Sequence, residues 1–536
     1  MSIDEPKPGP HSKAFWDREP SFPSPLDPAF ARFGIRLLDP TAGVSRSGVR
    51  ARPTLYFGRN LLVSAALSTD EARSTLSGIA EENGWSLSVD ESLRNRLTLA
   101  EAEIGVTRLR IAPLALGRAE PDAWALLQEA RRRFGPEALV GIGLEHVVVS
   151  GPHWSASPHW SASPHWSASP HWSASPADTY SAVGSGGRQP VAFTGARPSR
   201  STAREWDERK TGSRPVVAVL DTGCGEHPWF TFTDRDGDLV RLVDEAVDLD
   251  GTQIGFGAAP HPPDPEVGGD FDGPIDGLID PLSGHGTFIC GLIHQQCPDA
   301  DLIAWRVVPS AGFIPEGDLI DALVAIATLA QRFAVGAEDG QRIDVLNLSL
   351  GFYHETPQDA LVVGPLLDAL TVLANAGTAV VCAAGNDATA RPVFPAAFAP
   401  QLRGNSGVPL CSVGALNPNE SSIALFSNTG DWVTHYEVGA SVLSTMPAFE
   451  GGIMPVARTG SPWGLRESVD SDDFSTGRNP DHRDGGFALW SGTSFAAPVL
   501  AGRIASAIIA QQAADGDDRS GQLGRVRRAV AELDGS

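Results

Sequence analysis

The chain has 536 residues, of which 42% are apolar and 20% are charged, and its formal net charge is −24. A chain of this length exceeds one ordinary hydrophobic core, so we expect two or three folded units. The excess of acidic residues argues against a nucleic-acid-binding surface, which requires clustered positive charge. Five cysteines without a Cys-x-x-Cys pair predict free, buried thiols and neither a disulfide framework nor a zinc site.

Residues 1–51 are polar and proline-rich and predict a disordered or extended lead-in. They contain no apolar core of a secretory signal. No stretch of the chain reaches the roughly 18 consecutive apolar residues that indicate a membrane span. We therefore expect a cytoplasmic protein with no membrane span, an expectation that a wrongly assigned start or a non-standard export route would overturn.

Residues 52–150 predict a small domain of the ferredoxin-like α+β type. An apolar strand at 54–67 precedes a helix that begins at Ser68, where Ser68 and Glu71 form a capping box. Alternating residues at 85–89 and 107–114 indicate two strands, 121–135 indicates a second helix, and 138–150 indicates a last strand. The order β-α-β-β-α-β is typical of the ferredoxin-like fold.

Residues 151–214 predict a linker that contains the six-residue unit HWSASP four times. A proline in every unit favours a polyproline II conformation, which places successive histidines on one face but roughly 19 Å apart. That separation is too large for them to share a metal ion unless the tract folds back. A semi-stiff linker is the simpler interpretation.

From residue 215 to residue 536, apolar strands alternate with helices, which predicts a mostly parallel α/β sheet flanked by helices. Strands are expected near 216–221, 300–308, 342–351, 378–386, 410–416 and 432–445. Helices are expected near 285–296, 317–333 and 365–377, and a helix that begins near Ser494 closes the series. Polar side chains follow several strands directly, at the edge where parallel sheets carry their functional groups.

Four residues at that edge have side chains suited to catalysis. Asp221 lies in the sequence DTG, but a single such loop lacks the second carboxylate of an aspartic protease. His285 stands between two glycines at a helix start, and Asn386 follows a buried strand. Ser494, like nearby Ser491, precedes an apolar run. Taken singly, each has a structural explanation: a helix cap, a solvent-facing ring, or a turn.

The four sequences VAVLDTG, GHGTFICGLI, AAGND and SGTSFAAPVLAG resemble, in this order, the signature blocks of the subtilisin-like serine proteases. The resemblance covers about residues 215–510 and implies the subtilisin-like fold. It implies that Ser494 is the nucleophile and that His285 is the general base. Asp221 would orient the imidazole, and Asn386 would bind the oxyanion together with the backbone N–H of Ser494.

The same resemblance implies that a polypeptide substrate binds as an extended strand against two segments. These segments are Ser349, Leu350 and Gly351, and Ala383, Ala384 and Gly385. Phe352 departs from the family pattern, which often has glycine there, so we expect a reshaped rim of the substrate cleft. Insertions at about 252–282 and 451–487 either narrow access to the site or are tolerated surface loops.

No cofactor and no metal ligand are assigned, although many proteins of this family bind calcium. Two acidic runs are candidates, and solvated turns are the simpler interpretation because neither run has the spacing of a known calcium loop. The first run contains Asp234, Asp236 and Asp238, and the second contains Asp270, Asp272, Asp276 and Asp280.

Alternatives remain for both parts of the chain. The protein is expected to be a serine endopeptidase; a catalytically inactive subtilase-fold binding module and an esterase or amidase on small substrates are the competing hypotheses. Residues 52–150 are either a propeptide-like domain that docks on the catalytic cleft until it is removed, or a permanent partner-binding domain.

Overall fold

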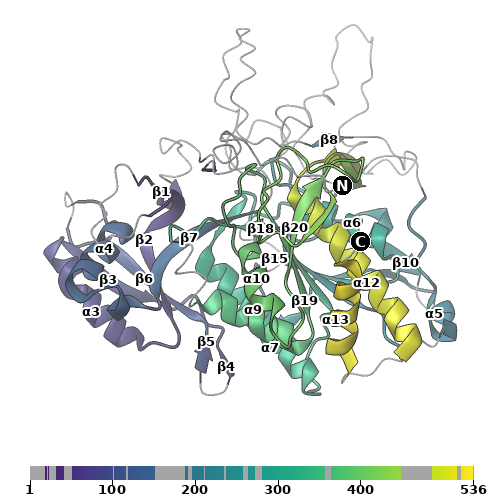
Figure 1. The fold of residues 1–536 in the computed structure, drawn as a ribbon, viewed down its shortest axis with the longest axis horizontal. Coiled ribbons are helices and arrows are strands. Elements are labelled where there is room, and N and C mark those ends of the chain that lie inside the picture. The colour runs from purple at the N-terminus through teal and green to yellow at the C-terminus, as the bar shows by residue number, and fades with distance from the viewer. Residues whose placement is uncertain are drawn as a thin grey trace, which may run out of the picture.

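The structure is a computed structural model of the whole chain (Figure 1). It describes residues 19–20, 22, 32–40, 51–99, 102–115, 119–150, 188–190, 196–209, 212–233, 237–256, 263–271, 280–356, 364–447, 449, 486–515 and 521–534. The HWSASP repeat, residues 257–262 and 272–279 of the first insertion, and nearly all of the second insertion lie outside these residues.

The N-terminal part folds as the sequence predicts, with two helices on one antiparallel sheet. Its main strands lie in the order β7-β2-β6-β3, which is the arrangement of a ferredoxin-like domain. The elements are β2 (Thr54–Ser64), α3 (Thr69–Glu82), β3 (Trp85–Asp90), β6 (Val106–Pro113), α4 (Ala123–Phe134) and β7 (Ile142–Ser150). The hydroxyl of Ser68 accepts the N–H of Glu71 at 3.3 Å, so this serine caps α3 as expected.

Three short elements of this region were not expected. Strand β1 (Ile35–Leu38), within the predicted lead-in, pairs with β2. Strands β4 (Leu97–Leu99) and β5 (Ala102–Ile104) form a small hairpin. Each strand has only three or four residues, too few for a periodic pattern to stand out in the sequence.

The C-terminal part contains a parallel sheet, as the sequence predicts, with strand order β12-β15-β9-β17-β19-β20-β21. Every neighbouring pair in it is parallel. Its strands are β9 (Val216–Asp221), β12 (Val243–Asp244), β15 (Asp301–Arg306), β17 (Val345–Leu348), β19 (Ala379–Ala383), β20 (Cys411–Leu416) and β21 (His435–Val438). The central strands are buried on both faces, which explains their continuous apolar sequences.

Helices cover both faces of this sheet (Figure 1). One face packs on α7 (Glu316–Ala334) and α9 (Pro365–Ala376). The other packs on α6 (His285–Gln296), α12 (Thr493–Asp515) and α13 (Gln522–Leu533). The core beneath α7 also contains Leu62, Val106 and Val148 of the N-terminal sheet. The two parts of the chain therefore share one continuous hydrophobic core.

Of two expectations for the C-terminal part, the strands within 432–445 were confirmed and the closing helix was wrong. The segment 432–445 forms two strands, β21 and β22 (Val442–Thr445), and β22 pairs with β23 (Phe487–Trp490) in a separate sheet. A short segment that is not a strand separates β21 from β22 and contains Ser441, which has a φ of 53°. The helix that begins near Ser494 does not close the series, because the amphipathic helix α13 follows it and packs against it.

Helix α12 contains a segment, Thr493–Gln512, that is long and apolar enough by length and mean composition to cross a membrane, although polar residues interrupt its apolar run. Of its most apolar window, 67% is buried inside the molecule. A helix that is apolar on all sides lies either in a protein core or in a bilayer, and this burial places α12 in the core. All five cysteines are buried and free, as expected.

Candidate active site

The predicted catalytic residues meet at the carboxyl edge of the parallel sheet. Asp221 is the last residue of β9, Ser349 directly follows β17, and Asn386 lies three residues after β19. His285 is the first residue of α6, and Ser494 lies in the first turn of α12. The fold therefore brings together residues that are up to 273 positions apart, counting from Asp221 to Ser494.

Asp221 and His285 form a buried pair. The Nδ1 atom of His285 lies 2.7 Å from Oδ1 of Asp221, and both side chains are fully buried. The backbone N–H of Thr222 donates to the same carboxylate oxygen at 2.8 Å. Glycine is required at 286, because a Cβ there would lie 2.0 Å from the carbonyl oxygen of Gly223. This close approach brings the segment after Asp221 against the start of α6.

The Nε2 atom of His285 has no hydrogen-bond partner within the described part of the chain. Ser494 instead directs its hydroxyl to the carbonyl oxygen of Ser349, at 3.5 Å. Asp221 therefore holds one ring nitrogen of His285 and leaves the other available. A hydrogen bond between a nucleophile and its base is often not tight before substrate binds.

Ser494 occupies a helix turn that a proline has modified. Pro498 lies in the second turn of α12. Proline has no N–H, so the carbonyl of Ser494, four residues earlier, loses its helical partner. The hydroxyl of Ser349 donates to that carbonyl at 2.8 Å and replaces the missing bond. Ser491 has a different role, since its hydroxyl accepts the N–H of Ser441 at 2.8 Å.

Asn386 is held in one orientation. Its Oδ1 atom accepts the backbone N–H of Thr493 at 2.8 Å and the Thr493 hydroxyl at 3.0 Å. The amide nitrogen consequently points away from Thr493, and it lies 3.6 Å from the position that a Cβ of Gly492 would take. The arrangement presents an N–H donor beside the start of α12, as an oxyanion site requires.

The predicted substrate-binding segments lie on either side of a small cavity. Ser349, Leu350 and Gly351 form one wall through β18 (Leu350–Gly351) and the residue before it, and Ala383 and Gly385 form the other. The cavity has a volume of about 100 Å³ and reaches Asn386 and Ser494. Ala384 is fully buried behind this wall, and its carbonyl oxygen accepts an amide N–H of Asn428 at 2.9 Å.

Asn428 is one of the residues that sequence reasoning missed. Its Oδ1 atom accepts the backbone N–H groups of Asp387 and Thr389, at 3.0 and 3.1 Å. The backbone N–H of Asn428 donates to the carbonyl of Gly385 at 2.9 Å. It thereby fixes the loop that carries Asn386. The sequence signal was weak, because an asparagine in a loop usually indicates a turn.

The end of β7, from the N-terminal domain, occupies the edge where substrate binding is predicted. Strand β7 pairs antiparallel with β18, with Ser150 opposite Leu350 and Val149 opposite Gly351. On its other side it pairs with β16 (Phe313–Pro315). The last residues of the N-terminal domain thus form an added strand between two segments of the catalytic domain, the geometry by which proteases bind extended peptides.

Ser150 contacts the Asp221–His285 pair directly. Its hydroxyl donates to Oδ2 of Asp221 at 2.8 Å and lies 3.4 Å from Nδ1 of His285. The carbonyl oxygen of Ser349 is 3.3 Å away. No sequence motif marks this serine. Only the pairing of β7 with β18 places it at the site.

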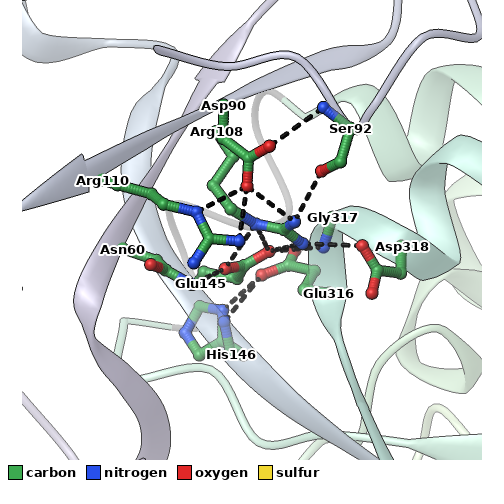
Figure 2. Close-up of polar contacts among 10 residues, drawn as sticks. All are labelled: Asn60, Asp90, Ser92, Arg108, Arg110, Glu145, His146, Glu316, Gly317 and Asp318. Carbon is green, nitrogen blue, oxygen red and sulfur yellow. Dashed lines mark hydrogen bonds and ion pairs between the residues drawn. The ribbon is translucent and has the colours of Figure 1, made fainter. Parts of the chain in front are cut away.

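A charged network joins the two domains beside this strand (Figure 2). Arg108 of β6 donates to the buried carboxylate of Glu145 at 2.6 Å and to Asp318 of α7 at 2.7 Å. Glu145 also accepts the backbone N–H of Gly317, at 3.3 Å, at the start of α7. Burial raises the pKa of the Glu145 carboxyl, and the Arg108 charge opposes that rise. A carboxylate at a helix N-terminus is stabilised by the helix dipole.

His146, the next residue of β7, lies between two carboxylates of the catalytic domain. Its Nδ1 atom is 2.6 Å from Glu316 and its Nε2 atom is 2.6 Å from Glu355. The ring stacks on Phe352 at 4.8 Å, so the residue that departs from the family pattern contacts the N-terminal domain. The charges of Glu316 and Glu355 outweigh the effect of burial and raise the pKa of His146 to about 10. A protonated imidazole therefore satisfies both carboxylates.

His146, His354 and Glu355 are also the one group of described residues whose donor atoms, within 4.8 Å of one another, have the types and spacing of a metal site. Both ring nitrogens of His146 already face carboxylates, and Nδ1 of His354 accepts the N–H of Thr356 at 3.0 Å. The group is thus complete as a hydrogen-bonded ion cluster. Of the calcium candidates, Asp234, Asp236, Asp272 and Asp276 lie outside the described residues.

Comparison with solved structures gives two examples of low similarity. The chain is similar to fervidolysin from Fervidobacterium pennivorans, described as a keratinolytic enzyme related to subtilisin, with 17% identity, a TM-score of 0.41, and coverage of 88% of this chain and 56% of that one. It is similar to a cold-adapted subtilisin-like serine proteinase with 20% identity, a TM-score of 0.33, and coverage of 63% and 88%.

Curated relatives include a thermophilic serine proteinase of Bacillus sp. (strain AK1), 27% identical over 48% of this chain and 52% of the relative. The subtilisin-like protease het-Q2 of Podospora anserina is 29% identical over 54% and 68%. The alignment thus spans about half of the length of the first relative. A third relative, of Bacillus subtilis, is named a minor extracellular protease, so these names give no support to the expected cytoplasmic location. The model of the subtilase family matches residues 212–523, more than half of the chain, and the chain belongs to that family.

Proposed function

We propose that this chain is a serine endopeptidase in which Asp221, His285 and Ser494 form the catalytic triad. The observation that carries the proposal is the buried 2.7 Å pair of Asp221 and His285, with Nε2 of the ring left available at the edge where α12 presents Ser494. Nε2 would take the Ser494 proton as the hydroxyl attacks the substrate carbonyl, and would later return a proton to the leaving amine.

Asn386 and the start of α12 would stabilise the oxyanion. Thr493 holds the Asn386 amide oxygen and so directs the amide N–H groups toward the region where the carbonyl oxygen becomes negative. The backbone N–H of Ser494 and the positive end of the α12 dipole add to this field. Loss of one such donor costs about 3–4 kcal/mol of transition-state stabilisation, a magnitude the general rule takes from subtilisin itself.

We also propose that the N-terminal domain covers the substrate cleft until it is cut away. Strand β7 pairs with β18, where an extended substrate is expected to bind, and Ser150 bonds to Asp221. The backbone pairing of β7 with β18 and the contact of the Ser150 hydroxyl with Asp221 would prevent other peptides from binding in the cleft. We expect the wild-type protein to cleave itself within residues 150–214, first at the bonds that directly follow Ser150.

The test compares the wild type with Ser494→Ala and uses Ser491→Ala as the matched control. Ser491 is three residues away, and its hydroxyl accepts the N–H of Ser441 and touches no triad residue. We expect a fluorophosphonate probe to label the wild type and Ser491→Ala, and not Ser494→Ala. Mass spectrometry should show trimming within 150–214 for the two labelled proteins alone.

Three outcomes would each contradict one of these proposals. A wild type that takes no label and leaves casein intact would favour the inactive binding module. A wild type that cleaves casein while its own chain stays whole would refute the removable N-terminal domain and favour a permanent one. Hydrolysis of short acyl esters without hydrolysis of casein would favour an esterase.

A further inference from the structure

One buried carboxylate joins the segments that carry Asp221 and His285. Glu266, from the loop 263–271, is 3% exposed. Its Oε1 atom is hydrogen-bonded to the hydroxyl of Thr222 and accepts the N–H of Gly286 at 3.1 Å. Its Oε2 atom is hydrogen-bonded to the hydroxyl of Thr287. Thr222 directly follows Asp221, and Gly286 and Thr287 directly follow His285. One side chain thus ties the two segments together.

The hydroxyl proton of Thr222 has two possible acceptors at this junction. The Thr222 oxygen accepts the N–H of Gly286 at 2.7 Å, so its single proton is left to donate. Two carboxylates are within its reach, Glu266 and Oδ1 of Asp221, the latter at 3.2 Å. When Glu266 is ionised, Thr222 can donate to it. When Glu266 is protonated, its own O–H donates to Thr222, and the Thr222 proton is free for Asp221.

The other side of the Glu266 carboxyl does not have this choice. The Thr287 oxygen accepts the N–H of Gly225 at 2.7 Å, and its hydroxyl reaches one carboxylate among the described residues, Glu266, so its proton donates to Oε2 of Glu266. The proton that changes place must therefore move along the path from Glu266 through Thr222 to Asp221. This path ends on the carboxylate oxygen that contacts His285.

We propose that Glu266 is a positioning residue that holds the Asp221 and His285 segments together, and whose protonation state decides whether Thr222 donates to the Asp221 carboxylate. The proposal rests on the triad chemistry proposed above for its effect on rate. It assigns a role to a residue of the first insertion, which was expected to affect only access to the site or to be a tolerated loop.

The surroundings of Glu266 favour its neutral form. Burial, helped by the charges of Asp264 and Asp221, raises the pKa of Glu266 to about 8, although the hydrogen bonds from Thr222 and Thr287 oppose the rise. The charge of Glu266 also acts on the buried Arg188, but this guanidinium bonds to the carbonyls of Ser283 and Asp280. Arg306 is paired with Asp264, at 3.5 Å. His285 faces the same junction across Asp221.

The sign of the effect follows from these contacts. Above its pKa, Glu266 adds a negative charge near His285 and withdraws the Thr222 donor from Asp221. Both changes favour the imidazolium that forms during proton transfer from Ser494. The rate of attack should therefore rise a second time as Glu266 ionises, in addition to the rise caused by His285 itself.

The first experiment needs no hydrolysis. In full-length Ser494→Ala, the downfield proton NMR resonance of the His285 Nδ1–H should shift with an ionisation near pH 8. Glu266→Gln retains a hydrogen-bonding side chain but cannot ionise, and Thr222→Val breaks the path; both should lose this shift. Thr222→Ser should keep it. Persistence of the shift in Glu266→Gln would overturn the proposal, and would do so whether or not the wild type is a protease.

The second experiment measures kcat/KM for a peptide ester between pH 6 and pH 10. We expect a second rise of about two- to tenfold near pH 8 in the wild type and in Thr222→Ser, and a single ionisation in Glu266→Gln and Thr222→Val. Glu245→Gln is the matched control, because Glu245 also lies beside Gly223 but bonds to Cys224 and Arg241 instead. Curves of the same shape for the wild type and Glu266→Gln would overturn the proposal.

Discussion

Strand β7 meets the catalytic domain in two ways, and the two contacts differ in chemistry. At its end, Val149 and Ser150 pair with β18 through the backbone, an interaction that any extended peptide can make. A few residues earlier, Glu145 and His146 enter a network of charges. A substrate in an extended conformation could take the place of Val149 and Ser150 beside β18. The charged contact requires the side chains of Glu145 and His146, which a general substrate lacks. We therefore infer that these charges select the N-terminal domain, and that the pairing of β7 with β18 places its end in the cleft.

The largest expected effect comes from removing the central cation of the network. Arg108→Ala leaves the buried Glu145 carboxylate with no charged partner, and breaking a buried pair in this way costs about 3–5 kcal/mol. Hydrogen exchange of the β18 amides in full-length Ser494→Ala should report this as easier local opening.

Arg110→Ala is the control for this variant, because Arg110 on the same strand pairs with Asp90 and is exposed. It should change the opening free energy by less than about 1 kcal/mol. Equal effects of Arg108→Ala and Arg110→Ala would show that the network does not hold the domain in place.

A smaller effect is expected from pH. The pKa of His146 is raised in the docked state to about 10 from an ordinary value near 6.5, so its contribution to docking is complete below about pH 6.5 and is lost as the pH rises through 10. One proton changes the opening equilibrium by at most about tenfold per pH unit in this window.

Hydrogen exchange rates of the β18 amides, corrected for the intrinsic effect of pH, should show this slope between pH 7 and pH 9. His146→Gln should remove most of it. A slope that is unchanged in this variant would mean that another group controls release of the domain.

The smallest effect is expected where the end of β7 pairs with β18. Ser150→Ala removes one hydrogen bond to Asp221, worth about 1.5 kcal/mol, or roughly a tenfold easier opening. The backbone pairing remains, so β7 should still dock. Ser77→Ala is a suitable control, because its hydroxyl donates to the carbonyl of Arg73 at 2.7 Å on the exposed side of α3 and touches neither the network nor the cleft. Loss of docking in Ser150→Ala would mean that the charges do not suffice to select the domain.

Much of the molecule could be predicted from the sequence. The elements of the N-terminal domain carry clear periodicity and a capped helix, and the parallel strands are apolar because both of their faces are buried. Asp221, His285, Asn386 and Ser494 lie in local motifs whose small neighbours are needed for close packing. These patterns and motifs each lie within a few neighbouring residues of the sequence, so no tertiary information was needed to find them.

Tertiary structure alone decided what lies between the motifs. Ser150, Glu266, Asn428 and the pair Glu145 and His146 contact residues that are 20 to 209 positions away, and no local pattern distinguishes them from ordinary polar residues. Their significance arises because burial makes an unpaired polar group costly, so each must find a partner wherever the fold places one. Sequence thus determined the proposed catalytic groups, while the packing of the chain determined which side chains hold and cover them.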